Sequence, residues 1–65
     1  MEDPRLTARK LIEQDAGYLH ELWVRYWANG GDAQFFEFQA YLYGVYERSP
    51  FDLKILTWVL EEISA

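Results

Sequence analysis

The chain has no cysteine, one histidine and two prolines among its 65 residues. Without cysteine it can form neither disulfides nor thiolate-bound metal sites, and the single His20 leaves few nitrogen ligands for a metal. No apolar run approaches the roughly 20 residues that span a bilayer, and the first residues do not resemble a signal peptide. We therefore expect no cofactor, no metal and no membrane segment, and a cytoplasmic location.

Basic residues are also scarce. Six lysines and arginines face eleven aspartates and glutamates, for a formal net charge of −5. Three of the six, Arg5, Arg9 and Lys10, lie in the first ten residues. An acidic chain repels the phosphate backbone, so direct nucleic-acid binding is disfavoured.

The length indicates a single domain with little core. A chain of this size buries only about 60% of the surface that its unfolded form exposes. Natural domains this small often rely on disulfides, a metal or association with another chain. Because the first two have little or no support in the composition, self-association or a bound partner remains.

Aromatic residues are what the chain has in abundance: three tryptophans, five tyrosines and four phenylalanines. Such density predicts an unusually aromatic core, an adhesive surface, or both. Ten of these twelve residues lie in one stretch, namely Tyr18, Trp23, Tyr26, Trp27, Phe35, Phe36, Phe38, Tyr41, Tyr43 and Tyr46.

The first third of the chain has a helical pattern. Asp3 can cap a helix that begins with Pro4. Large apolar residues then recur every three or four positions as far as Trp27, which predicts a helix over residues 4–28. Gly17 is unfavourable inside a helix, and Asp15 is an acceptable cap for a second one. Two alternatives stay open: one helix, which the unbroken stripe favours, or two helices that meet near 15–17.

Two further helices follow. Asn29 and the two glycines after it predict the end of the first helix, and Asp32 a cap for a second over 33–47. Ser49-Pro50 predicts the start of a third helix over 50–63. The expected fold is all-α, with three helices joined by short turns. The alternative is a β-hairpin between Trp23 and Tyr43 that turns at Asn29-Gly30.

Motifs for catalysis are weak. His20-Glu21 begins like a zinc-protease helix, but Val24 stands where the second histidine belongs. Gly30-Gly31 matches neither of the phosphate-binding loop patterns, G-x-x-x-x-G-K-[ST] and G-x-G-x-x-G, and the acidic Asp32 follows it. A surface histidine and a helix end are the simpler interpretations, so we expect no enzyme.

The aromatic residues predict a protein interface instead. They form more than one apolar stripe, which a domain this small cannot hide completely, and a homodimer would be the simplest cover. The expected function is a small acidic protein-interaction module, acting as an adaptor, regulatory subunit or inhibitor. The alternative is an acidic mimic of nucleic acid that inhibits a DNA- or RNA-handling protein, and a small enzyme comes third. The predicted interface residues are Trp23, Tyr26, Trp27, Phe36, Tyr41 and Tyr43.

Overall fold

The computed structural model describes residues 2–64 as four helices joined by short loops. The expected all-α class is confirmed, but the count of three helices is not. No β-strand occurs within residues 2–64, so the alternative hairpin between Trp23 and Tyr43 is wrong. The helices are α1 (Pro4–Gln14), α2 (Gly17–Ala28), α3 (Phe35–Leu42) and α4 (Pro50–Ser64).

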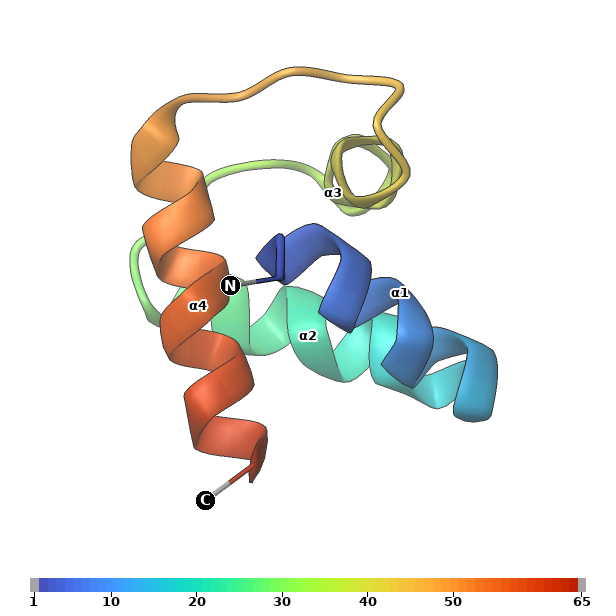
Figure 1. Ribbon diagram of the computed structural model, residues 1–65. Coiled ribbons are helices and arrows are strands. Elements are labelled where there is room, and N and C mark those ends of the chain that lie inside the picture. The colour runs from blue at the N-terminus through green and yellow to red at the C-terminus, as the bar shows by residue number, and fades with distance from the viewer. Residues whose placement is uncertain (1, 65) are drawn as a thin grey trace.

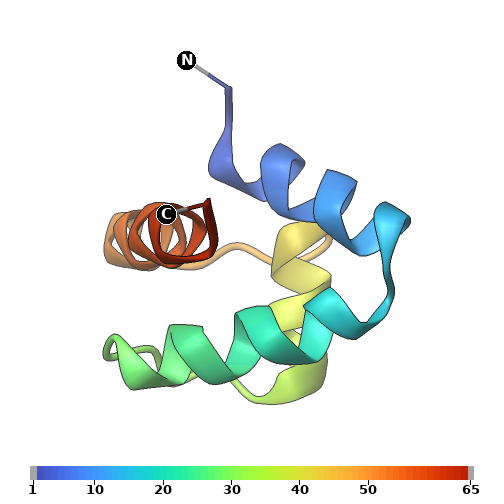
Figure 2. The same ribbon diagram turned by 90° about the horizontal axis from the view of Figure 1, so that it is seen from below.

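The helices pack around one small core. α1 and α2 form a hairpin, and α4 crosses it and contacts both helices (Figure 1). α3 also contacts both α1 and α2, as the view from below makes clear (Figure 2). The result measures 25 × 24 × 21 Å. One continuous helix over 4–28 would be about 37 Å long, which is longer than any dimension of the domain.

The first predicted helix is interrupted at Asp15. This residue is extended, with φ −156° and ψ 113°, and its carboxylate accepts the N–H of Gly17 at 2.9 Å. The continuous helix over 4–28 is therefore wrong, and the alternative with two helices is right. The apolar stripe continues across the break because α1 and α2 turn their apolar faces toward the same core.

α2 ends where the sequence predicts. Gly30 has φ +104°, a conformation that glycine adopts without penalty. The N–H of Gly31 donates to the Tyr26 carbonyl at 2.9 Å, and that of Gly30 to the Trp27 carbonyl at 3.1 Å. This pair of bonds is the Schellman motif, which closes a helix C-terminus.

α3 is shorter than predicted at both ends. It begins after Gln34, whose backbone N–H donates to the Glu37 carboxylate at 2.9 Å in a capping box. It ends at Leu42 because Gly44 adopts φ +79° and the Val45 N–H turns back to the Ala40 carbonyl at 2.9 Å. The predicted range 33–47 is thus wrong, and a second Schellman motif at Gly44 is the signal that sequence reasoning overlooked.

α4 begins at Pro50 as predicted and extends one residue past the predicted end, to Ser64. α1 likewise begins as predicted, with the Asp3 carboxylate accepting the N–H of Arg5 at 2.9 Å. Both starts depend on signals contained in a few consecutive residues, which is why sequence alone locates them.

The core receives side chains from all four helices and from the loop before α3. Among its larger members, the rings of Tyr26 and Phe38 lie 4.8 Å apart between centroids. The buried apolar residues are Ala8, Leu22, Tyr26, Ala33, Phe38, Tyr41, Leu42, Ile55, Leu56 and Val59.

Candidate interaction surface

The six predicted interface residues divide between core and surface. Tyr26 and Tyr41 are 0% and 3% exposed. The prediction that these two present their rings to a partner is therefore wrong, because this chain's own residues cover both. Trp27, Phe36 and Tyr43 are exposed by 45%, 71% and 42%, and Trp23 is half-buried.

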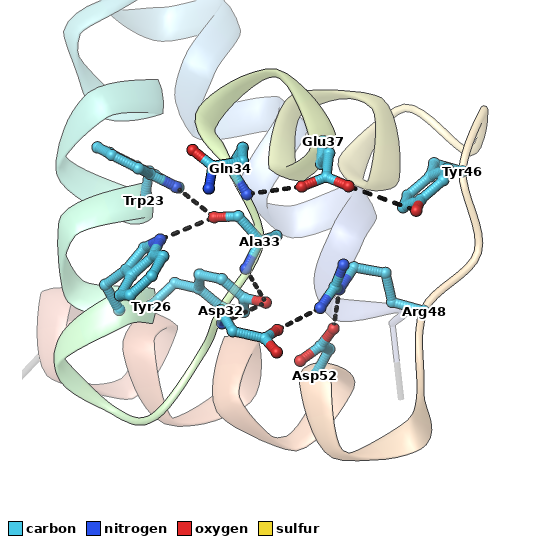
Figure 3. Close-up of polar contacts among 10 residues, drawn as sticks. Trp23, Tyr26, Asp32, Ala33, Gln34, Glu37, Tyr46, Arg48 and Asp52 are labelled. Carbon is cyan, nitrogen blue, oxygen red and sulfur yellow. Dashed lines mark hydrogen bonds and ion pairs between the residues drawn. The ribbon is translucent and has the colours of Figure 1, made fainter.

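Both the ring and the hydroxyl of Tyr26 make contacts within this chain. Its ring packs on Phe38, and its hydroxyl accepts the backbone N–H groups of Asp32 and Ala33, each at 3.3 Å (Figure 3). Desolvation by burial raises the pKa of Tyr26 and, with the same leading cause, the pKa of Tyr41. The periodic pattern places tyrosine on an apolar face but does not say whether that face meets the core or a partner.

Trp23 and Trp27 hold the loop that follows α2. Their indoles meet edge to face with centroids 6.3 Å apart. Both indole N–H groups donate to the Ala33 carbonyl, Trp23 at 3.0 Å and Trp27 at 2.7 Å. Phe35 lies 5.4 Å from Trp23, again edge to face. The two tryptophans share one face of α2, and both of their N–H groups donate to this acceptor within the chain.

One exposed aromatic pair, Phe36 and Tyr43, lies on α3 and its C-cap. Seven positions correspond to nearly two helical turns, so Phe36 and Tyr43 point in almost the same direction. That direction is opposite to the buried residues Phe38, Tyr41 and Leu42. Between the two aromatics on the same side lie Gln39, which is exposed, and Ala40, which is half-buried. We call Phe36, Gln39, Ala40 and Tyr43 the α3 ridge.

The α3 ridge carries no charge along its length but has charged groups at its ends. The guanidinium of Arg9, from α1, lies 6.0 Å from the centre of the Tyr43 ring. Glu37 follows Phe36 at the other end, where its carboxylate accepts from the Gln34 backbone N–H at 2.9 Å and the Tyr46 hydroxyl at 3.4 Å. The ridge is therefore uncharged at its centre, cationic beside Tyr43 and anionic beside Phe36.

Arg48, in the loop after α3, forms one ion pair with Asp32 of the loop before α3, whose side chain is 78% exposed, and a second, nearly buried pair with Asp52 of α4. Arg48 donates from one nitrogen to Asp52, which is 4% exposed, and from another to Asp32 (Figure 3). The hydrogen bond to Asp52 is the main cause that raises the pKa of Arg48. This contact takes Asp32 away from the capping role predicted for it, since the partner of Asp32 lies sixteen positions along the chain.

The remaining candidates for catalysis or ligand binding are His20, a surface hollow and the acidic side chains. His20 is exposed, and its ring lies 6.0 Å from Trp23 and 6.2 Å from Phe35 rather than beside a carboxylate. A surface hollow of about 270 Å³ lies between the start of α1 and the end of α4, and its lining contains none of the predicted interface residues. Within residues 2–64, no three histidine, aspartate or glutamate side chains are grouped as metal ligands.

None of the helices described here combines the length and the apolarity that crossing a bilayer requires. Comparison with protein-family models, with curated proteins and with solved structures found no match for the chain. Among the exposed aromatic residues within residues 2–64, Phe36 is the least covered by the fold.

Proposed function

We propose that this protein is a non-enzymatic interaction module that binds another protein chain through the α3 ridge. The observation that carries the proposal is Phe36, a phenylalanine 71% exposed on the side of its helix that faces away from the core. Its neighbour on that side, Tyr43, is 42% exposed. We propose that the module acts as an adaptor, regulatory subunit or inhibitor and that it works in the cytoplasm.

Binding would use Phe36 and Tyr43 as anchors. Covering a phenylalanine side chain stabilises a complex by up to about 1.5–3 kcal/mol, and tyrosine is among the residues that dominate binding energy at interfaces. Ala40 between them is small enough to let a partner approach the helix backbone. Because no charged group lies along the ridge, little desolvation cost opposes its burial.

The short helix is also held rigidly for this purpose. Gln34 and Glu37 close its start with a capping box, and the bond from the Val45 N–H to the Ala40 carbonyl closes its end. Arg48 joins the loops on either side. A helix that is already formed loses little conformational entropy on binding, which favours affinity.

Nucleic-acid mimicry receives less support. A mimic needs free carboxylates spaced like phosphates, yet many acids of this chain are paired with its own cations. Asp32 and Asp52 bind Arg48, and Glu21 and Glu62 bind Arg25 at 3.2 and 3.3 Å. These pairs partly neutralise the negative surface that a basic cleft would recognise.

The test is site-specific photo-crosslinking with p-benzoylphenylalanine in place of Phe36, in cells that express the chain naturally. The matched control carries the same group at Phe51, an exposed phenylalanine of α4 that is 52% exposed. We expect a discrete adduct from position 36 that is much weaker from position 51. Adding Tyr43→Ser to the position-36 variant should reduce the adduct.

The proposal would be rejected by either of two results. One is the absence of any adduct from position 36 at natural expression levels. The other is the same set of adducts from positions 36 and 51, because that outcome would reflect general stickiness of exposed aromatic residues rather than a defined surface.

A further inference from the structure

We infer that the partner that covers the α3 ridge is a second copy of this chain, joined by a two-fold axis that passes between Gln39 and Ala40. The inference rests on the proposed function and names the partner for it. It follows from the order of the residues along the ridge, from the charges at its two ends and from the composition of its surroundings.

The ridge has an aromatic residue at each end, at positions 36 and 43. Its two middle members, Gln39 and Ala40, lie symmetrically about the midpoint. When two such helices pack antiparallel, Phe36 of each copy meets Tyr43 of the other. The two Gln39 side chains then lie together on one side of the axis, and the two small Ala40 residues lie together on the other side. This reciprocity, in which residue i contacts j and j contacts i, is what a two-fold interface requires.

The charges favour the same antiparallel arrangement. Arg9 lies beside Tyr43, at 6.0 Å from its ring centre, while Glu37 lies next to Phe36. An antiparallel pair brings the cationic end of each ridge to the anionic end of the other, twice. A parallel pair would place like charges together at both ends, which is unfavourable.

The uncharged centre explains why self-association would use α3 rather than another helix. The chain has a net charge of −5, so two copies repel each other over most of their surfaces. The outer face of α4 carries Lys54, Glu61 and Glu62, and Glu21 lies exposed on α2. Contact along the ridge brings two copies together without placing charges against each other at the centre.

The size of the ridge indicates a weak, reversible dimer. Eight residues give a helix about 12 Å long, which covers less than the roughly 800 Å² per partner of a typical stable interface. The turn after α3 adds apolar area, since Val45 and Tyr46 are 81% and 43% exposed. We therefore expect monomer and dimer to exchange with protein concentration.

The test uses opposite charges at Gln39, the exposed residue nearest the proposed axis. Sedimentation velocity between about 5 and 500 µM should show wild-type protein moving from monomer toward dimer. Gln39→Glu and Gln39→Lys each place two like charges across the axis and should weaken the dimer at least about tenfold. An equimolar mixture of the two variants should recover affinity close to wild type, because opposite charges then face each other.

Lys54→Glu on α4 is the control and should leave the dimer affinity within about twofold. The inference is wrong if wild type stays monomeric over the whole range, if the control weakens the dimer as much as the Gln39 variants, or if the mixture is no tighter than either variant alone. A monomer that still cross-links from position 36 to a different protein would reject the second copy and keep the proposed function. A monomer with no adduct from position 36 would reject both.

Discussion

The ring of Tyr26 occupies the space that a side chain at Gly31 would need. A β-carbon built on Gly31 would lie 2.3 Å from the Tyr26 ring, far inside van der Waals contact. The backbone of the loop after α2 can lie flat on this ring only because residue 31 has no side chain.

Gly31→Ala is therefore expected to lower the free energy of unfolding by about 1–3 kcal/mol through overpacking. Urea unfolding followed by circular dichroism measures this. The control is Gly17→Ala, whose β-carbon would approach only the exposed Asp15 carboxylate, at 3.2 Å, and which should change the free energy of unfolding by less than about 0.5 kcal/mol. Equal losses in the two variants would show that the clash with Tyr26 is not the cause.

Tyr26→Phe keeps the ring and removes the hydroxyl that accepts two backbone N–H groups. Because the Ala33 N–H is buried and would lose its acceptor, we expect a loss of about 1–3 kcal/mol. Tyr43→Phe, which removes an exposed hydroxyl, should change the unfolding free energy by less than about 0.5 kcal/mol. A neutral Tyr26→Phe would mean that the loop does not depend on this hydroxyl.

Trp23→Phe and Trp27→Phe should act non-additively, because both indoles donate to the one Ala33 carbonyl. Each single variant leaves the carbonyl with one donor, whereas the double variant leaves it with neither. A double-mutant cycle measured by urea unfolding should give an interaction energy of about 0.5–1.5 kcal/mol, with the double variant worse than the sum. Strict additivity would contradict the shared acceptor.

Arg48→Met should destabilise the protein strongly. It leaves the nearly buried Asp52 carboxylate without its counter-ion, and breaking a buried pair costs about 3–5 kcal/mol. Arg25→Met is the matched control: its partners Glu21 and Glu62 have side chains 47% and 42% exposed, so the loss should stay near 0–1 kcal/mol. Similar midpoints for both variants in urea would show that the Arg48–Asp52 pair contributes no more than an exposed ion pair.

Stability should fall at alkaline pH because of Tyr26 and Tyr41. Burial raises the pKa of both hydroxyls in the folded protein above the value near 10 of an unfolded chain. The folded state thus favours neutral tyrosine, so this contribution is fully present below about pH 10 and is lost as pH rises through the folded pKa. Urea unfolding across this range should show the loss, and Tyr41→Phe should reduce it, whereas Tyr43→Phe should not.

The sequence pattern predicts an aromatic interface but does not say which face of α3 is exposed. Phe36 and Tyr43 lie together on the solvent side of the helix. Tyr26 and Tyr41, predicted for the same interface, are buried. Helical periodicity determines which residues share a face, but it contains no information on which face the rest of the chain covers.

The sequence by itself determined the helical class and the helix ends that depend on adjacent residues. Asp3-Pro4, Asn29-Gly30 and Ser49-Pro50 each act through backbone geometry and bonds within a few positions. Only the tertiary structure decided that Asp15 interrupts the first helix, that Asp32 meets Arg48 and that Tyr26 faces inward while Trp27 reaches the surface. These outcomes depend on contacts between residues far apart in the chain, where packing of one small core outweighs local preference.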